Sequence, residues 1–208
     1  MFVKTVPLED VLVTNTYFYI DEETKHGFLI DPAAEPKKLL DIIRDEGWTI
    51  EKMLITHGHF DHIGAVGVLH ERLGIPYYAH QAAQDYLSKP KLNLSAYCGR
   101  DISLTEASFF QDDDEIYLEA NPSAKLKVIH TPGHTADSVL FYDVANHLAF
   151  VGDTIFKGSI GATHFPGGDF QQLKQSLLQK VFSLPEETVL YSGHSEATTI
   201  RQEKNQLL

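Results

Sequence analysis

The feature that most restricts how this chain can fold is a run of metal-binding side chains at residues 57–62. His57, His59, Asp61 and His62 follow directly after the apolar residues Met53–Ile55, which indicate the end of a buried strand. A polar loop whose histidines only cap and hydrogen-bond is disfavoured by this spacing. Imidazole and carboxylate suit zinc, iron or manganese, and four such groups exceed the needs of one catalytic zinc. The pattern therefore predicts a core strand that ends at a polar pocket, with room for a second metal.

Composition limits the partners of the chain. With 208 residues, 43% of them hydrophobic, it can bury one substantial core, and we expect a single domain over 1–208. A formal charge of −12 without a basic run argues against nucleic acid and anionic membranes as partners. The sequence shows neither a signal peptide nor an apolar stretch long enough to span a bilayer. Cys98 is the only cysteine, which favours the reducing cytoplasm. We expect a small-molecule substrate, and the oligomeric state is left open.

The first half of the chain alternates strand and helix signals. β-Branched and aromatic runs predict strands, and apolar residues at helical spacing predict helices. The expected strands are 2–6, 11–20, 27–30, 52–55 and 76–79, and the expected helices are 36–46, a helix starting near 62 and ending at 73, and 80–87.

The second half repeats this order after a segment that is hard to interpret. Residues 88–114 are expected to form a covering loop that contacts substrate, and the acid run 112–115 a solvated turn. Strands are then expected at 126–129, 139–142, 148–151 and 188–191, with helices at 170–182 and 197–208. Strands and a helix occurring in both halves suggest an α/β (α+β) fold of two mixed β-sheets packed face to face, with helices outside.

Polar motifs follow strand ends in both halves. They are His-Gly-His-Phe-Asp-His at 57–62, Thr-Pro-Gly-His-Thr at 131–135, Gly-Asp-Thr at 152–154 and Ser-Gly-His at 192–194. In this order the four motifs resemble the metallo-β-lactamase superfamily over nearly the whole chain. The resemblance implies a four-layer αββα sandwich with a two-metal site at one edge.

The resemblance also implies how the ligands divide. His57, His59 and His134 would hold the first metal, Asp61, His62 and His194 the second, and Asp153 would bridge them. Two divalent ions, in the first place zinc, with iron or manganese as alternatives, would lower the pKa of a shared water from about 15.7 towards 7.

Two aspartates have further expected roles at this site. Asp61 is the candidate catalytic residue, because it could take the proton when the metal-bound hydroxide attacks. Asp31 matches the family's early acidic motif and is a candidate hydrogen-bond acceptor for a ligand histidine. The alternative for Asp31 is a turn-forming aspartate before Pro32.

Within the superfamily, the chain is most similar to short, single-domain relatives of glyoxalase II, the hydroxyacylglutathione hydrolases. This similarity rests on residues 152–156, 158–161, 165–168 and 197–200. It implies hydrolysis of a thioester, in which hydroxide attacks the acyl carbonyl, a metal polarises its oxygen and the thiolate leaves.

Several departures concern the substrate. Ala162 and His164 stand where these relatives carry Arg or Lys and, two residues later, Asp or Tyr, and Ser195-Glu196 replaces a usual Gly-Pro. A cation at 162 would pair with an acidic substrate such as glutathione, and Ala162 cannot. The helical domain with which long glyoxalase II enzymes bind glutathione is not expected in this chain. Lys157 is a candidate substitute cation, with an exposed lysine as the alternative.

Alternative functions remain open at this stage. A one-iron persulfide dioxygenase would use two histidines and Asp153, and lactone or lactam hydrolysis would use the same hydroxide. A binding module on a hydrolase scaffold is the third alternative, disfavoured because no expected ligand is missing. Cys98 is expected to be a packed or idle thiol. Among the remaining histidines, His70 is expected at the surface, and His26, His80 and His147 in turns or at helix starts. His130 is expected to be buried and hydrogen-bonded, and His164 to lie near the substrate mouth.

Overall fold

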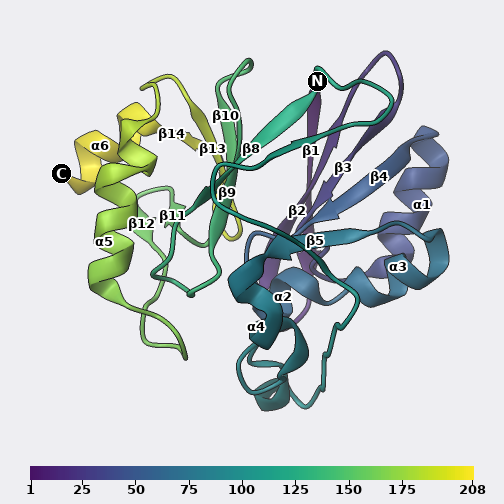
Figure 1. The fold of residues 1–208 in the computed structure, drawn as a ribbon, viewed down its shortest axis with the longest axis horizontal. Helices are drawn as coiled ribbons and strands as arrows, with labels where there is room; N and C mark the ends of the chain where they lie inside the picture. Colours follow the sequence, from purple (N-terminus) through teal and green to yellow (C-terminus); the bar gives the residue numbers. More distant parts are fainter.

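Two six-stranded sheets form the centre of the molecule, and the first comes from the N-terminal half. A computed structural model describes residues 1–208 (Figure 1). In the first sheet the order is β1-β2-β3-β4-β5-β6, with β1, β2 and β3 antiparallel and the later pairs parallel. Its strands are β1 (Phe2–Glu9), β2 (Val13–Ile20), β3 (His26–Ile30), β4 (Thr49–Leu54), β5 (Tyr77–His80) and β6 (Ser108–Phe110).

The second sheet has the order β14-β13-β10-β9-β8-β7, and only β10 and β13 are parallel. Its strands are β7 (Glu115–Tyr117), β8 (Lys125–His130), β9 (Val139–Asp143), β10 (Leu148–Gly152), β13 (Val189–Ser192) and β14 (Thr198–Thr199). A small hairpin of β11 (Ile155–Phe156) and β12 (Ser159–Ile160) stands apart from both sheets.

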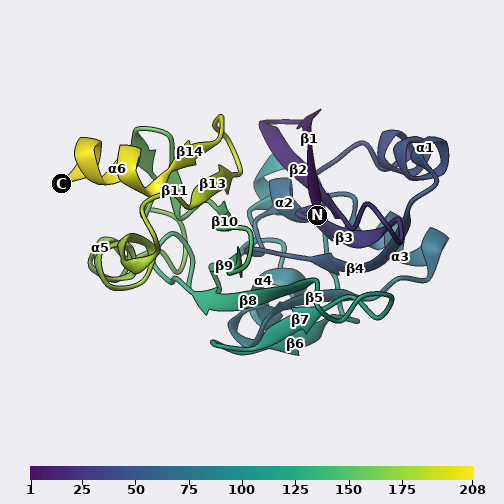
Figure 2. The same cartoon turned by 90° about the horizontal axis from the view of Figure 1, so that it is seen from above.

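Helices cover the outer faces of both sheets, as the view from above shows (Figure 2). On the first sheet lie α1 (Pro36–Glu46) and α3 (Val66–Leu73), and on the second lie α5 (Phe170–Gln179) and α6 (Ile200–Leu207). The remaining helices are α2 (Phe60–Ile63), α4 (Gln84–Ser88) and the 3-10 helices η1 (Gln81–Ala83), η2 (Ser95–Cys98) and η3 (Val181–Ser183). The predicted αββα sandwich is confirmed. None of the helices combines the length and apolar character that a membrane span requires.

Strand alternation builds the layers between sheets and helices. In β2, Phe18 packs towards α1 and α3, while its neighbour Tyr19 packs into the layer between the sheets. From the second sheet, Phe141 and Phe150 enter the same central layer and are fully buried. Because successive side chains of a strand point to opposite faces, each strand supplies two cores at once. Burial of one such aromatic ring contributes about 1.5–3 kcal/mol.

The prediction of one continuous helix from near residue 62 to residue 73 is wrong, because this stretch is divided between α2 and α3. A Cβ at Gly64 would lie 2.3 Å from the carbonyl oxygen of Ala33, so the chain passes very close to the loop after β3. The amide of Ala65 donates to the carbonyl of Pro32 at 2.9 Å instead of continuing a helical ladder. A tertiary contact therefore overrides the helical spacing of the apolar residues.

Other element boundaries also differ from the expectation. The second strand starts at Val13 rather than residue 11, and the helix expected to reach 182 ends at Gln179, followed by η3. The final helix starts at Ile200, because 198–199 form the edge strand β14. Strands of two or three residues, such as β6, β7 and β14, are too short to show a hydrophobic period.

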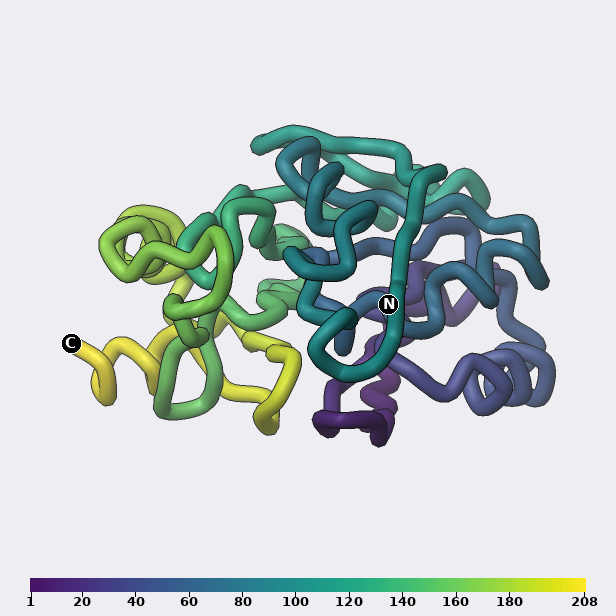
Figure 3. Tube along the Cα trace, turned by 90° about the horizontal axis from the view of Figure 1, so that it is seen from below, coloured from purple at the N-terminus to yellow at the C-terminus, as the bar shows by residue number.

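The segment 88–114 is not simply a loop, which corrects the expectation. It contains η2 and the edge strand β6, which pairs in parallel with β5. In the view from below, the teal chain after α4 passes in front of the N-terminal strands (Figure 3). Within the acid run, Asp112 and Asp113 do form a turn, but Asp112 accepts a hydrogen bond from Lys180 at 2.7 Å and Glu115 opens β7.

His80 should make the stability of the fold depend on pH. Its ring is 4% exposed, stacks on His130 at 4.0 Å and accepts the amide N–H of Ala82. Burial first, then His130, with Lys180 adding to and Asp112 opposing the shift, lowers the pKa of His80 from 6.5 to about 4. Between pH 6.5 and 4, His80 is protonated in the unfolded chain but stays neutral in the folded chain. Stability should therefore fall by about 1–3 kcal/mol as pH drops from 6.5 to 4.

Urea unfolding of the wild type and of His80→Gln at pH 8, 6 and 5 measures this contribution. Because other groups titrate in the same range, the informative quantity is the stability difference between the two proteins. That difference should shift in favour of the variant as pH falls. A difference that stays constant with pH would contradict the assignment to His80.

Candidate metal centre

The loop after β4 delivers the first ligand-type side chains. His57 and His59 lie on extended backbone beyond the strand, and His59 is also the N-cap of α2 with φ −68° and ψ 148°. Asp61 and His62 lie in the single turn of α2 and are buried. As expected, the two loop histidines face the same side, with His57 Nε2 and His59 Nδ1 3.2 Å apart.

His134 completes the first group from the loop after β8. Its Nε2 lies 3.0 Å from His59 Nδ1, so the three rings of His57, His59 and His134 converge. Two nitrogens held at about 2.0–2.1 Å from one tetrahedral ion lie about 3.3 Å apart, close to these separations. The three residues therefore form a candidate metal-binding group.

A second group is built from Asp61, His62 and His194. The Nε2 atom of His194, beyond β13, lies 3.2 Å from Asp61 Oδ2, and His62 Nε2 lies 3.7 Å from the same oxygen. Ligand atoms of all three lie within 4.8 Å of one another. Residues separated by more than 130 positions in sequence thus meet at one edge of the sandwich.

Asp153 lies between the two groups. Its Oδ1 is 3.3 Å from His62 Nε2, while its Oδ2 is 3.6 Å from His134 Nε2 and 3.3 Å from His194 Nε2. The carboxylate follows β10 and is largely buried. One carboxylate thus faces ligand nitrogens of both groups.

Unpartnered buried atoms test whether this cluster fits metal ions. His59 Nε2, His62 Nε2 and Asp153 Oδ1 are all buried without a hydrogen-bond partner. In His59 it is the other ring nitrogen, Nδ1, that faces His57 and His134. An unpartnered buried polar atom costs about 1–3 kcal/mol, and two of these three, His62 Nε2 and Asp153 Oδ1, face each other across the cluster. Imidazole nitrogen and carboxylate oxygen are the donors that zinc, iron and manganese accept. The residues therefore fit two divalent ions.

Backbone and side-chain acceptors fix the ring tautomers. The Nδ1–H of His134 donates to the carbonyl of Ala162 at 2.7 Å, and that of His194 donates to the carbonyl of Val13 at 2.8 Å. His62 donates through Nδ1 to Asp31 Oδ2 at 2.8 Å, which is the hydrogen bond expected of Asp31. In all three rings Nε2 is left as the atom that can bind metal.

The histidines of the first group are held neutral. Burial, followed by the neighbouring imidazoles, lowers the pKa of His57 well below its usual value. Burial together with His134 lowers the pKa of His59 to about 3. Neutral imidazole is the form that binds metal, so this group is ready for an ion at neutral pH.

The second group has the opposite electrostatics. Burial alone would lower the pKa of His194, but Asp153 and Asp61 outweigh it and raise that pKa to about 10. Burial alone would raise the pKa of Asp153, but His62 and His194 outweigh it and hold that pKa well below its usual value. The cluster without metal therefore holds protons that two cations would replace.

We expect Asp31→Asn to weaken metal binding about 10–100-fold. Asp31 is 2% exposed and also accepts the Thr56 amide at 2.7 Å, so it orients the His62 ring from a fixed position. Competition with a chelator measures the affinity. Asp21→Asn is the matched control, because Asp21 is another buried strand-end carboxylate that contacts no ligand residue. Equal affinity in wild type and Asp31→Asn would contradict the positioning role.

Two residues at the site were not found from the sequence. Asp137 is 1% exposed, and its Oδ2 accepts the amide N–H of Gly58, between His57 and His59, at 2.8 Å. Burial raises the pKa of Asp137 to about 6. Thr14 Oγ1 lies 3.2 Å from Asp61 Oδ2. An acid three residues after His134 was the available signal for Asp137, whereas nothing in the sequence marked Thr14.

The remaining predicted residues lie outside the cluster. Lys157 pairs with Glu196 at 2.7 Å and does not line the pocket at the cluster, so it is not a free substitute cation. His70 is half-buried and donates to the carbonyl of Ile75, which corrects its surface assignment. His130 is hydrogen-bonded to the carbonyl of Ala136, as expected, but it is half-buried rather than buried. His26, His80 and His147 lie in turns or at strand ends, and the exposed His164 packs on Phe165.

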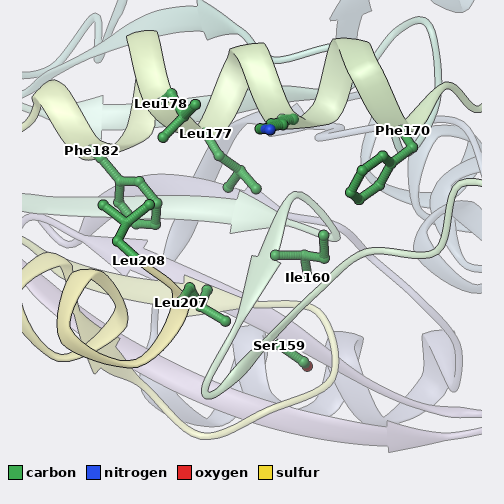
Figure 4. A pocket seen from close by; sticks show the side chains of 9 residues that line it. Ser159, Ile160, Phe170, Leu177, Leu178, Phe182, Leu207 and Leu208 are labelled. Carbon is green, nitrogen blue, oxygen red and sulfur yellow. The ribbon is translucent and has the colours of Figure 1, made fainter.

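A pocket of about 450 Å³ opens onto the cluster. Five candidate ligands, His59, Asp61, His134, Asp153 and His194, line its floor. Cys98, expected to be a packed or idle thiol, is half-buried and lines this pocket. A different groove lies between α5, α6 and β12 (Figure 4), where Phe170, Leu177 and Leu208 line the walls. That groove contains no candidate ligand, so the first pocket is the candidate substrate site.

The sequence matches one family model. Residues 10–194 match the model described as "Metallo-beta-lactamase superfamily". The matched range includes all seven side chains of the cluster.

Two curated relatives extend over most of the chain. A "Probable metallo-hydrolase YqgX" of Bacillus subtilis (strain 168) is 35% identical over 193 residues, covering 92% of this chain and 90% of the relative. A "Hydroxyacylglutathione hydrolase GloC" of Haemophilus influenzae is 30% identical over 186 residues, covering 88% of this chain and 86% of the relative.

Two solved structures share both the fold and about a third of the sequence. The BLEG-1 B3 metallo-beta-lactamase is 34% identical with a TM-score of 0.91, covering 98% of this chain and 97% of that one. TTHA1623, solved in a di-iron-bound form, is 34% identical with a TM-score of 0.86, covering 98% of each chain.

Proposed function

The chain belongs to the metallo-beta-lactamase superfamily, and we propose that within it the protein is a two-metal hydrolase that cleaves thioesters. His57, His59 and His134 would hold one ion and Asp61, His62 and His194 the other. The observation that carries this proposal is the Asp153 carboxylate, whose oxygens lie 3.3–3.6 Å from ligand nitrogens of both groups.

Bound divalent ions would polarise the acyl carbonyl and make a water molecule nucleophilic at neutral pH. The role of the protein's own residues is then to orient the substrate and to accept a proton. Asp61 lines the pocket, and its Oδ2 is already engaged by Thr14 and His194. The chain makes no hydrogen bond to Oδ1 of Asp61, so we propose that this atom takes the proton.

The pocket favours a leaving group that needs no proton. Apart from the candidate ligands, only Tyr97 and Cys98 among its lining residues carry a proton that could be donated. A thiol has a pKa of about 8.5 and leaves readily as thiolate, whereas the amine of an amide must be protonated. Thioester cleavage therefore needs no proton donor for the leaving group at this site, whereas lactam cleavage does. A similar protein is nevertheless named a B3 metallo-beta-lactamase.

Metal analysis combined with a substrate panel tests the proposal. Protein purified from its own host is analysed for metal per chain and assayed on a thioester, a lactone, a β-lactam and a persulfide. We expect two divalent ions per chain and thioester cleavage that a chelator abolishes and added metal restores. One iron per chain with oxygen uptake on the persulfide would instead establish the one-iron dioxygenase. Zinc is the proposed metal, with iron as the alternative because similar TTHA1623 has a di-iron-bound form.

We also propose that residues 1–208 form one domain, because residues from both sheets share the layer of Phe28, Phe141 and Phe150. A cytoplasmic location is proposed from the single free thiol of Cys98. The substrate is proposed to be a small molecule, in keeping with the size of the pocket.

A further inference from the structure

The wall above the metal cluster has no charged side chain. Besides the five candidate ligands, the pocket is lined by Val11, Leu12, Phe60, Leu94, Tyr97, Cys98, Phe165 and Pro166. None of these eight is an aspartate, glutamate, lysine, arginine or histidine, and most are aliphatic or aromatic. A substrate that fills the pocket therefore meets carboxylates and imidazoles at its reacting end and apolar surface elsewhere.

Large apolar side chains at the mouth are exposed to solvent. Tyr97 is 72% exposed, Val11 55% and Leu12 49%, although each could be polar without disturbing the core. Val11 and Leu12 come from the turn between β1 and β2, and Tyr97 comes from η2, so two distant segments present apolar surface to one opening. Contiguous exposed apolar surface beside a pocket is typical of a ligand-binding site.

The wall is also held in place relative to the candidate ligands. Asn93 is fully buried, and its carbonyl accepts the amide N–H of Phe60, within the ligand loop, at 2.8 Å. Leu94 follows with φ +71°, a left-handed conformation that leucine rarely adopts. Strained backbone beside a pocket suggests that a side chain is held there for function. The apolar wall is thus positioned before substrate arrives.

Cations close to the mouth are already neutralised. Arg100 pairs with Asp10, which joins the η2 segment to the β1–β2 turn, and Lys157 pairs with Glu196. The whole chain carries a net charge of −12, which disfavours the approach of an anionic group to the opening.

We propose that the preferred substrate is a thioester of an apolar acyl group joined to a thiol that carries no negative charge. This inference rests on the proposed thioester hydrolysis and names its substrate class. The acyl chain would lie against the wall formed by Leu12, Leu94, Tyr97 and Phe165, with its carbonyl towards Asp61 and Asp153. Glutathione thioesters, with two carboxylates, would be poor substrates.

Matched substrates test the two parts of this inference. Acetyl and octanoyl thioesters of N-acetylcysteamine, which is neutral, are compared with octanoyl glutathione on the metal-loaded protein. One buried methylene corresponds to about a fourfold gain in affinity, and an open pocket captures part of it. We therefore expect kcat/KM to rise at least about tenfold from acetyl to octanoyl, and to fall at least about tenfold from the neutral octanoyl ester to octanoyl glutathione.

Charge variants locate the effect. Leu12→Lys and Tyr97→Lys place a cation on exposed positions of the wall, so folding should be unaffected, and metal content checks this. Each should shift the ratio of neutral to glutathione ester at least about fivefold towards glutathione. Phe170→Lys is the matched control, since Phe170 is 52% exposed in the separate groove of Figure 4, and it should leave the ratio unchanged.

The outcomes separate this inference from the function on which it rests. Octanoyl glutathione cleaved as fast as the neutral octanoyl ester would overturn the inference and leave a thioester hydrolase in place. A ratio that Phe170→Lys shifts as much as Tyr97→Lys would overturn the role of the wall. Failure of the two-metal protein to cleave any thioester would overturn the proposed function itself, and the inference with it.

Discussion

Asp153→Ala is expected to lose both metal ions and to reduce kcat/KM by at least about 10³-fold. The substitution removes the only carboxylate whose oxygens face both groups of histidines, at 3.3–3.6 Å. It also removes one of the charges that oppose His62 and His194, which keep only Asp31 and Asp61 as carboxylate partners. Metal-supplied stabilisation of several kcal/mol corresponds to this loss of rate. Elemental analysis and steady-state kinetics on the same preparation measure the two effects together.

Asp101→Ala is the control for loss of a negative charge, because Asp101 is an exposed carboxylate outside the pocket. It should retain wild-type metal content and activity. Asp153→Ala protein that still holds two ions per chain would rule out a bridging role for this carboxylate. Circular dichroism of both variants shows whether the fold survives the substitution.

Gly193→Ala is expected to reduce metal content and to lower activity by about 10²-fold or more, without any change in the ligand side chains. A Cβ at this position would lie 2.3 Å from Asp153 Oδ1 and 2.7 Å from His62 Cε1. Gly193 is also tied on both sides, since its amide donates to Gly152 and its carbonyl accepts from Asn15 at 2.7 Å. These two hydrogen bonds hold the backbone at Gly193 in place, so the Asp153 carboxylate and the His62 imidazole must move instead. Displacement of a reacting group by about 1 Å costs about 10²-fold in rate.

Gly67→Ala is the matched control for a glycine-to-alanine change. Its Cβ would meet only Leu104 Cδ2, at an ordinary 3.5 Å, and α3 should gain about 1 kcal/mol of stability. The two variants are compared by metal content and thermal unfolding after chelation. If Gly193→Ala binds metal as tightly as Gly67→Ala, the packing of β13 against the cluster has no part in holding the ions.

Much of the fold could be predicted because buried elements carry a period. Alternation in β2 separates Phe18 from Tyr19 and sends them to different layers, and helical spacing identifies α1 and α5. The break between α2 and α3 could not be predicted, because it depends on the contact of Gly64 with Ala33. Short edge strands such as β14 carry too few residues to show any period.

The candidate site was found for a related reason. Histidine and aspartate at strand ends are chemically distinctive, so His57, His134 and Asp153 could be singled out one by one. The residues that support them are ordinary in type. Thr14 and Asp137 have no distinctive spacing, and their roles depend on where β2 and the loop after β8 pass. The carbonyls of Val13 and Ala162 carry no side-chain signal at all.

By itself the sequence determined the donor chemistry, the alternation that builds four layers, and the family to which the chain belongs, since these follow from residue types at short spacing. Only the tertiary structure decided which ring nitrogen of each histidine is free, which cations are already paired, and that the wall of the pocket is apolar. These properties arise between segments far apart in the chain, such as Val13 with His194 and Asp10 with Arg100. Local periodicity contains no information about such contacts, and the packing of the two sheets supplies it.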